Sequence, residues 1–303
     1  MSESAHHLTP SDQDLAASLG AFTSRLAVHR HVRLRYVIGG EGPLLVLLPS
    51  WPETWWTFRK VMPALAAARR TVLAVDLPGM GASDPLRGGY DRKAMAARIR
   101  DLVVGLGYRK ADVAGHGIGA QVAFSLAANS GDLVDRVVLM ESAHPDEELY
   151  TLPLVPRREV DLHPWWVALH WVPDLAETVL RGPMRPFVDL VLDAELVDPT
   201  NVADLDREVY AAALQSPGAV SAAAGWFRSL ATDIRDLEGY DQIPHPTLGL
   251  ASWAGDGTVS RRLKSALARQ TRDGSVVTIP DSGHFFPEER PRLVVAEMLN
   301  FLE

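Results

Sequence analysis

The sequence predicts an α/β fold in which a mostly parallel, doubly wound sheet carries helices on both faces. Mainly apolar runs typical of strands buried on both faces lie at residues 44–48, 71–75, 111–114 and 136–140. Helical patterns separate them, at residues 54–67, 92–106 and 118–128. Regular alternation of strand and helix implies right-handed crossovers between parallel strands, and therefore a sheet of this type.

Two segments precede the first buried run and differ from it in pattern. Residues 25–30 and 32–37 alternate between apolar and polar side chains, and the second segment ends at Gly39-Gly40. Alternation with a glycine stop is typical of half-exposed antiparallel strands. These two strands bring the number predicted before the middle of the chain to six.

The strand pattern is interrupted after the sixth strand. Residues 142–242 contain amphipathic helical patterns rich in Trp, Leu and Ala, and no buried strand is expected there. Strands are expected again at residues 247–252 and 275–279, followed by a closing helix at 291–302. We therefore predict a flexible leader, a core in two segments and a helical cap that covers the carboxyl ends of the strands, where open α/β sheets bind ligands. Their boundaries are 1–20 for the leader, 21–141 and 243–303 for the core, and 142–242 for the cap.

Composition excludes several classes of function. The net charge is −8 without a basic block, which argues against a nucleic-acid partner. Cysteine is absent, so the chain has no disulfide, thiolate catalyst or Cys-ligated metal. The polar leader does not resemble a signal peptide, and no apolar run approaches the roughly 18–20 residues that span a bilayer. We expect a cytoplasmic bacterial protein, monomeric or homodimeric, without membrane partner, metal or other cofactor.

A glycine-rich segment lies at the most informative position in the predicted sheet. Gly115–Gly119 (Gly-His-Gly-Ile-Gly) follows a buried strand and opens a helix, which is the context of a nucleophile elbow. Its central residue, Gly117, has no side-chain oxygen, so no covalent ester can form on it. Glycine also adopts the positive φ of such a turn without steric cost.

Four stretches together resemble the epoxide hydrolase and haloalkane/haloacid dehalogenase branch of the α/β-hydrolase superfamily. They are residues 49–56, 76–84, 115–119 and 282–291 (Ser-Gly-His-Phe-Phe-Pro-Glu-Glu-Arg-Pro). The cap stretch 170–175 is similar to the same branch. The resemblance extends from about residue 25 to the end of the chain. It implies an α/β-hydrolase fold and a hydrolytic site at the elbow.

The resemblance also implies roles for individual residues. His284 lies where the family places its general base, and Glu141 or, alternatively, Asp256 lies where members place the carboxylate that orients it. Of the two we favour Glu141, because a charged residue at the end of a buried strand needs a partner. The backbone N–H groups of Trp51 and Ile118 correspond to the oxyanion-hole donors.

Three departures from the family pattern change the expected chemistry. Gly117 replaces the family's Asp (Ser in esterases), Pro49-Ser50 replaces the usual His-Gly, and Phe227 replaces a cap tyrosine that binds the epoxide oxygen. Opening an epoxide through an ester needs a nucleophile at carbon and an acid at oxygen, and the expected providers of both are absent. The residues predicted to line a substrate pocket are Ser50, Trp51, Trp165, Trp166, Trp226 and Phe227.

Three hypotheses follow from this pattern. The first is an enzyme that uses His284 and Glu141 as an acid/base pair, without covalent catalysis, on an apolar and polyketide-like secondary metabolite. Cyclisation, isomerisation, elimination and direct water addition are reactions of this kind. The second is a non-catalytic binding or regulatory module, and the third is an Asp-dependent epoxide hydrolase with an engineered Asp-to-Gly knockout at residue 117. The absence of a carboxylate at residue 117 is expected to lower the pKa of His284.

Overall fold

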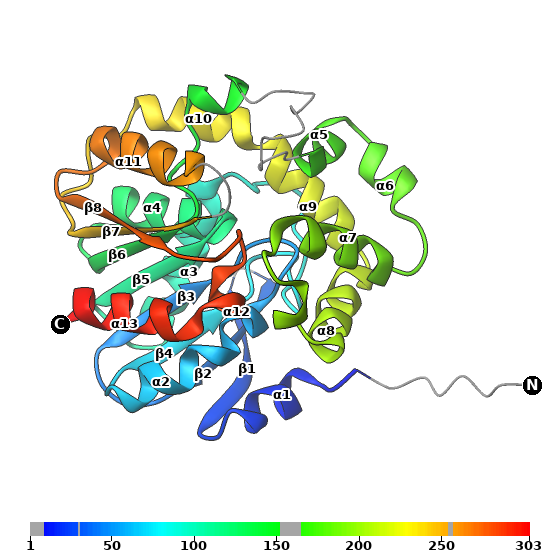
Figure 1. Ribbon diagram of the computed structural model, residues 1–303, viewed down its shortest axis with the longest axis horizontal. Coiled ribbons are helices and arrows are strands. Elements are labelled where there is room, and N and C mark those ends of the chain that lie inside the picture. Colours follow the sequence, from blue (N-terminus) through cyan, green and yellow to red (C-terminus); the bar gives the residue numbers. More distant parts are fainter. Residues whose placement is uncertain (1–8, 30, 152–164, 254–256) are drawn as a thin grey trace, which may run out of the picture.

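The computed structural model describes residues 9–29, 31–151, 165–253 and 257–303. One twisted eight-stranded sheet runs through the molecule in the order β1-β2-β4-β3-β5-β6-β7-β8 (Figure 1). The strands are β1 (Phe22–His29), β2 (Val32–Gly39), β3 (Leu44–Leu48), β4 (Thr71–Val75), β5 (Ala111–His116), β6 (Val134–Met140), β7 (Thr247–Ser252) and β8 (Gly274–Ile279). β1 and β2 pair antiparallel, and β2 pairs antiparallel with β4, whereas all other neighbours are parallel. The predicted fold class is confirmed.

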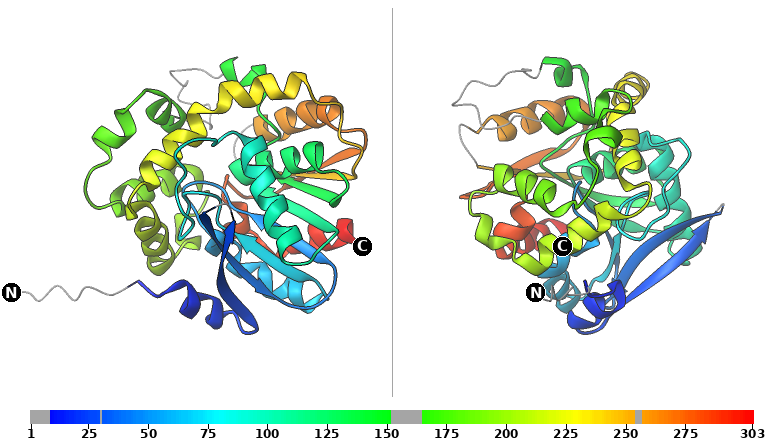
Figure 2. Two further views of the ribbon diagram at one scale, coloured as in Figure 1. Left: turned by 180° about the vertical axis from the view of Figure 1, so that it is seen from behind. Right: turned by 90° about the vertical axis from the view of Figure 1, so that its right-hand side faces the viewer.

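The order of the strands determines which helices cover each face. The chain moves from β3 to β4 in one direction across the sheet and from β5 to β6 in the other. Because both crossovers have the same hand, their helices lie on opposite faces. α2 (Met62–Ala67) packs with the closing helix α13 (Pro291–Leu302), and α3 (Arg92–Gly105) packs with α4 (Ile118–Asn129) (Figure 2).

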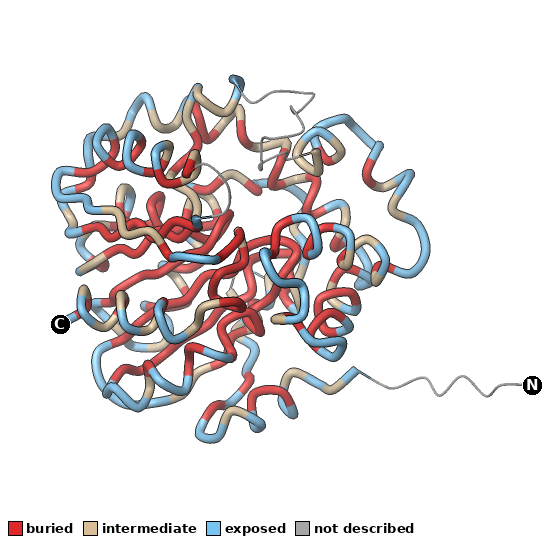
Figure 3. The backbone as a smooth tube through the Cα atoms, in the orientation of Figure 1, coloured by how far each residue is buried: buried red, intermediate tan, exposed pale blue. Residues whose placement is uncertain are grey.

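The parallel strands are the most deeply buried part of the molecule. Every residue of β3, β4, β5 and β7 is buried, and Figure 3 shows this buried layer at the centre with exposed backbone around it. Apolar side chains of both parities suit such strands because helices cover both faces. β1 and β2 alternate in burial only over residues 22–25 and 32–36, whereas Leu26 and Val28 are exposed and the neighbouring Tyr36 and Val37 are both buried. In the described ranges, no helix is both long and apolar enough to cross a bilayer.

The chain leaves the sheet after β6 and returns to it at β7. The helices between these strands are η2 (Glu147–Thr151), α5 (Trp165–Trp171), α6 (Leu175–Val179), α7 (Arg185–Glu195), η3 (Pro199–Asn201), α8 (Asp204–Gln215), α9 (Ala219–Arg228) and α10 (Leu230–Glu238). Figure 1 shows α5 to α9 on one side of the core, beyond the ends of the strands. We refer to residues 142–242 as the cap. Its core-facing helices α7 and α9 bury apolar stripes, as their amphipathic sequences predict.

Two local structures differ from the sequence-based expectation. The helix expected over residues 54–67 is divided into a 3₁₀ helix η1 (Trp55–Lys60) and α2, because Pro63 lacks the N–H group that would continue the first helix. Residues 12–18 lie in the expected flexible leader but form helix α1 (Asp12–Ser18), which Ser11 caps. Asp12 accepts a hydrogen bond of 2.7 Å from the indole of Trp55, and this contact attaches α1 to the core.

Two further helices complete the core. α11 (Thr258–Gln270) packs on β7 and β8. The short α12 (Phe286–Glu289) follows the loop after β8 and contacts η1. α12 thus holds the loop that contains His284 against the loop that begins at Pro49.

Candidate active site

The turn from β5 to α4 has the sharp geometry that the glycine-rich segment predicts. Gly117 precedes the first residue of α4 and adopts φ +52° and ψ −115°. Its backbone N–H donates a hydrogen bond of 3.0 Å to the carbonyl of Met140 at the end of β6. A side chain at this position is strained by the positive φ, so glycine is the least strained residue for the turn.

His284 lies in the loop between β8 and α12, and its backbone is fixed on both sides. Its N–H donates to the carbonyl of Glu195 in α7 at 2.9 Å. Its own carbonyl accepts a hydrogen bond from Nε2 of His116 at 2.8 Å. The imidazole is therefore positioned by the cap and by the end of β5 together.

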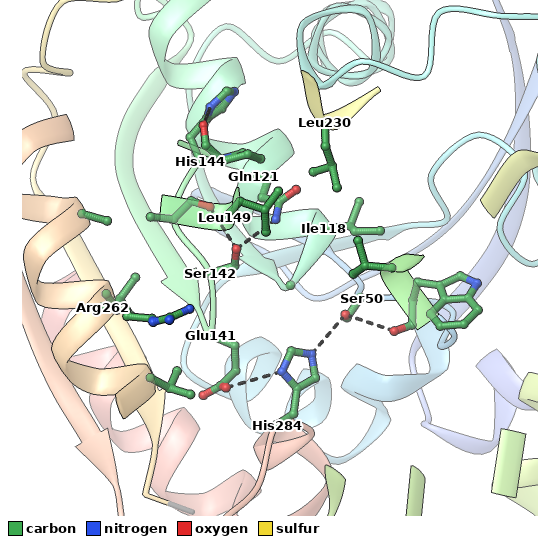
Figure 4. Close-up of a pocket in the computed structure, with 18 of the residues that line it drawn as sticks. Ser50, Ile118, Gln121, Glu141, Ser142, His144, Leu149, Leu230, Arg262 and His284 are labelled. Atoms are coloured by element: carbon green, nitrogen blue, oxygen red, sulfur yellow. Dashed lines mark hydrogen bonds and ion pairs between the residues drawn. The ribbon is translucent and has the colours of Figure 1, made fainter. Parts of the chain in front are cut away.

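Glu141 directly follows β6 and faces the imidazole of His284. Its Oε2 lies 3.4 Å from Nδ1 of His284 (Figure 4). The backbone N–H of Ser252 donates to Oε1, and the hydroxyl of Ser252 donates to Oε2 at 3.2 Å. Glu141 has φ +67°, an uncommon conformation for a residue with a side chain. The alternative partner, Asp256, lies outside the described residues.

The charge around His284 differs from the sequence-based expectation. Burial lowers the pKa of His284, but the hydrogen bond and negative charge of Glu141, together with the charges of Glu195 and Glu53, outweigh burial and raise the pKa above its usual value. We expected a lowered pKa because residue 117 carries no carboxylate. That expectation was wrong because the three remaining carboxylates stabilise the imidazolium form.

A buried group of titratable side chains behind His284 was not identified from the sequence. Nδ1 of His116 lies 3.5 Å from Oε2 of Glu53, and both side chains are fully inaccessible. Burial, and then the charge of His284, lower the pKa of His116 to about 3, so the ring is neutral. Burial raises the pKa of Glu195 to about 7 and that of Glu53 well above its usual value. Neither periodicity nor motif spacing shows that these residues converge, because they lie on four separate segments.

Ser50 occupies the space beside Gly117. Its Oγ lies 3.5 Å from Nε2 of His284, on the side of the ring opposite Glu141 (Figure 4). A Cβ atom on Gly117 would lie 2.2 Å from this oxygen and 2.9 Å from Cβ of Ser50. We predicted Ser50 as a pocket residue, which it is, but its proximity to His284 has no signal in the sequence.

The pocket above these residues is a cavity of about 260 Å³ between the core and the cap. Ser50, Trp51, Trp166 and Phe227 line it, as does Ile118. The ring of Trp51 contacts that of Phe227 at a centroid distance of 5.5 Å, so the two form a continuous aromatic wall. Most of the other lining side chains on the cap side are also aliphatic or aromatic, including Val167, Val191, Leu149 and Leu230.

Two predicted pocket aromatics do not line this cavity. Trp226 is 1% exposed, and its ring packs against Tyr90 at 6.3 Å in the interior. Trp165 is half-buried and packs edge-on against Phe187 at 5.9 Å. Helical periodicity explains the difference, because neighbouring positions on one helix face different directions.

Polar groups lie on the far wall of the cavity. The amide of Gln121 donates to the hydroxyl of Ser142 at 3.0 Å, and Arg262 also faces the cavity. Burial lowers the pKa of His144 to about 4, so this ring is neutral. No motif or periodic pattern in the sequence indicates that Gln121, Ser142, His144 and Arg262 line one cavity.

Two backbone donors adjoin Ser50 and Gly117. Ile118 is the first residue of α4, so its N–H has no partner within the helix. No acceptor for this N–H, or for that of Trp51, is found in the part of the chain that the structure describes. Both groups are available to stabilise negative charge on a bound oxygen.

Comparison with known proteins identifies the family. The sequence model of the Alpha/beta hydrolase family matches residues 45–297. The chain belongs to this family.

A soluble epoxide hydrolase of Corynebacterium sp. (strain C12) is 31% identical over 297 residues, covering 92% of this chain and 96% of that protein. The crystal structure of Cfl2 from Burkholderia cenocepacia has a TM-score of 0.82 and 28% identity, with 94% of this chain and 97% of that chain covered. The epoxide hydrolase CorEH has a TM-score of 0.79 and 29% identity, with 92% and 98% covered. This chain is thus a hydrolase-superfamily protein related to epoxide hydrolases.

Proposed function

We propose that this α/β-hydrolase-family chain is an epoxide-hydrolase-like enzyme that forms no ester at residue 117 and uses His284 and Glu141 as an acid/base pair. The observation that carries the proposal is the imidazole of His284, which is held by Glu141 on one side and faces the cavity beside Gly117 on the other. Glycine at the family's nucleophile position has no atom that could attack a substrate.

The reaction must be one that acid/base assistance can drive. A positioned general base or acid contributes roughly 10²–10⁴-fold to a rate, or about 3–5 kcal/mol. Such assistance suits cyclisation, isomerisation, elimination, or direct addition of water to an activated epoxide. Direct addition is favoured by the relatives, which are named epoxide hydrolases.

The substrate that suits this cavity is a small, apolar organic molecule. Trp51, Trp166 and Phe227 offer aromatic faces on the cap side, and Gln121 and Arg262 offer polar groups on the opposite side. A polyketide-like secondary metabolite has this distribution of apolar rings and a few oxygens. In this proposal residues 142–242 serve as a cap that excludes water from the reacting groups.

The position of Ser50 supports natural divergence over an engineered knockout at residue 117. An Asp at 117 would place its Cβ 2.2 Å from Oγ of Ser50, so the present loop does not accommodate that side chain without a shift. A single laboratory substitution would have left a loop that fits the original residue. A silent binding module would not require a base held on both sides by hydrogen bonds, as His284 is.

Isotope labelling in a single turnover tests the proposal. Excess protein is mixed with a set of aryl-substituted epoxides in H₂¹⁸O, and the diol is analysed by mass spectrometry. Direct water addition places ¹⁸O in the product of the first turnover, and His284→Ala removes the activity. An ester to any carboxylate would deliver ¹⁶O from the protein first and would overturn the proposal. A parent that converts none of the epoxides would exclude water addition and support the binding-module alternative.

A further inference from the structure

The hydroxyl of Ser50 fills the volume in which a nucleophile attached to residue 117 would lie. Ser50 is 3% exposed, and the small accessible part of it lines the cavity. Its Oγ is 2.2 Å from the position of a Cβ on Gly117, although Ser50 belongs to the loop after β3 rather than to the elbow. One oxygen atom is therefore present at the reacting position, supplied from a different strand.

The groups around Ser50 are arranged as an acid, a histidine and a hydroxyl in a line. Oε2 of Glu141 is 3.4 Å from Nδ1 of His284, and Oγ of Ser50 is 3.5 Å from Nε2 (Figure 4). A carboxylate beside Nδ1 favours the tautomer with its proton on that nitrogen. The lone pair of Nε2 then faces Ser50, which is the relationship between base and nucleophile in serine hydrolases. A distance of 3.5 Å in a free enzyme commonly shortens when substrate binds.

We propose that Ser50 is the nucleophile of a relocated Ser50–His284–Glu141 triad that cleaves carboxylic esters of apolar acids. This inference rests on the proposed role of His284 and Glu141, and it adds a second class of substrate to the same site. The backbone N–H groups of Trp51 and Ile118, which adjoin Ser50 and Gly117, stabilise the oxyanion.

The proposed ester hydrolysis needs water as its only co-substrate. Oγ of Ser50 forms a bond to the acyl carbon while its proton moves to Nε2 of His284. The bond from the acyl carbon to the alkoxy oxygen breaks, and the alkoxide takes the proton from Nε2 and leaves as an alcohol. Water, deprotonated by His284, then attacks the acyl carbon of the Ser50 ester, and Ser50 and a carboxylic acid are regenerated.

The chemistry of serine restricts the substrates of the Ser50 reaction to acyl compounds. Attack of a serine hydroxyl on an epoxide carbon would produce an alkyl ether, which has no carbonyl carbon for water to attack. Such an ether would end catalysis after one turnover. An acyl ester of serine, in contrast, is hydrolysed by the same base that formed it. The apolar wall formed by Trp51 of the core and by Trp166 and Phe227 of the cap suits the acyl chain.

Covalent labelling of the full chain tests the proposal without knowledge of the natural ester. The protein is treated with an alkyl fluorophosphonate, and the modified residue is identified by intact mass and peptide mapping. The expected result is a single adduct on Ser50 that is absent from Ser50→Ala and His284→Ala. Ser265→Ala, on the exposed face of α11, is the matched serine control and retains the label. A label on another residue, or no label, overturns the proposal.

Ester hydrolysis separates this proposal from the proposed function. With p-nitrophenyl butyrate and octanoate, Ser50→Ala is expected to lose at least about 10³-fold in kcat and the acyl-enzyme burst. If Ser50→Ala hydrolyses the esters like the parent while His284→Ala does not, the nucleophile is water. The Ser50 proposal then fails and the acid/base function stands. If His284→Ala retains activity on esters and epoxides alike, the proposed function fails, and the Ser50 proposal fails with it.

A cysteine variant provides a measurement that does not depend on turnover. The chain contains no cysteine, so Ser50→Cys has a single thiol whose alkylation by iodoacetamide is specific. If His284 faces residue 50 as a base, the thiol pKa falls below its usual value of about 8.5 and returns toward it in Ser50→Cys/His284→Ala. A thiol pKa that is at or above the usual value and unaffected by His284→Ala contradicts the proposal.

Discussion

Ser50 and Gly117 share one volume: a Cβ on Gly117 would lie 2.2 Å from Oγ of Ser50 and 2.9 Å from its Cβ. A side chain at residue 117 is therefore incompatible with Ser50 in its present position. The family resemblance predicts the reverse combination, in which the loop carries glycine and the elbow carries Asp. The two positions are therefore sterically coupled.

The first prediction concerns this coupling. Gly117→Asp is expected to lower the free energy of unfolding, because it adds both a clash with Ser50 and a side chain at positive φ. Adding Ser50→Gly removes the clash, so the double variant recovers about 1–3 kcal/mol relative to the sum of the single changes. Urea unfolding of the four proteins of this cycle measures the coupling.

A matched control distinguishes the clash from backbone strain. Gly107 also has a positive φ, +91°, but a Cβ there would meet nothing within 4 Å. Gly107→Asp is therefore strained without a clash, and its effect should be additive with Ser50→Gly. Equal coupling of Ser50→Gly to both glycine substitutions would contradict the steric explanation.

The second prediction concerns the pH dependence of the acid/base reaction. The pKa of His284 is raised, with Glu141 as the main cause that opposes burial, so the basic form is lost as the pH falls through this raised value. Glu141→Gln removes the negative charge and lowers the pKa of His284. The acid limb of the pH–rate profile is therefore expected to move to lower pH, while the maximal rate falls because Nδ1 loses its charged acceptor.

Glu195→Gln is the matched control for this experiment. Glu195 also raises the pKa of His284 through its charge, but its side chain makes no hydrogen bond to the ring among the described contacts. Because burial raises the pKa of Glu195 itself to about 7, much of its charge is lost across the acid limb. The acid limb should therefore move in the same direction by a smaller amount, with a smaller loss of maximal rate. An acid limb that stays in place in both variants would show that His284 is not the base.

Several features of the fold follow directly from the sequence. β3, β4 and β7 occupy the predicted residues, because short apolar runs between helical patterns are typical of the buried strands of a parallel sheet. The pairing of Glu141 with His284 was also predicted, since a carboxylate at the end of a buried strand requires a partner.

The features that could not be predicted depend on contacts between loops that are distant in the sequence. Ser50 and Gly117 follow different strands, and only the register of β3 against β5 brings the two residues together. Glu141 is the main cause that raises the pKa of His284 against burial, but Glu195 of the cap and Glu53 of the loop after β3 also contribute. Neither residue lies in a periodic pattern or at a motif spacing that indicates a buried charge.

The third prediction concerns the backbone that positions His284. A Cβ on Gly283 would lie 2.0 Å from the carbonyl oxygen of Glu195, the group that accepts the N–H of His284. Gly283→Ala must therefore move the loop or the end of α7. The His284-dependent kcat is expected to fall by on the order of 10- to 10²-fold, because small displacements of a catalytic group are costly.

Gly88→Ala is the control for Gly283→Ala, because a Cβ at Gly88 would meet nothing within 4 Å. It should leave kcat unchanged. A Gly283→Ala variant with the kcat of the parent would show that the hydrogen bond from His284 to Glu195 does not position the imidazole.

The fourth prediction concerns a buried ion cluster that joins the core to the cap. The guanidinium of Arg59 in η1 donates to Asp206 in α8 and to Glu288 in α12, and the side chain of Arg59 is 8% exposed. Tyr210 of α8 donates to the same carboxylate of Glu288 at 2.6 Å. Arg59→Met leaves the buried Asp206 without this cation and Glu288 with Lys60 alone, so the free energy of unfolding should fall by about 3–5 kcal/mol. Arg33→Met breaks the pair with Asp84, in which the arginine side chain is 58% exposed, and should cost no more than about 1 kcal/mol. Urea unfolding compares the two variants, and equal small losses would mean that Arg59 does not hold the cap on the core.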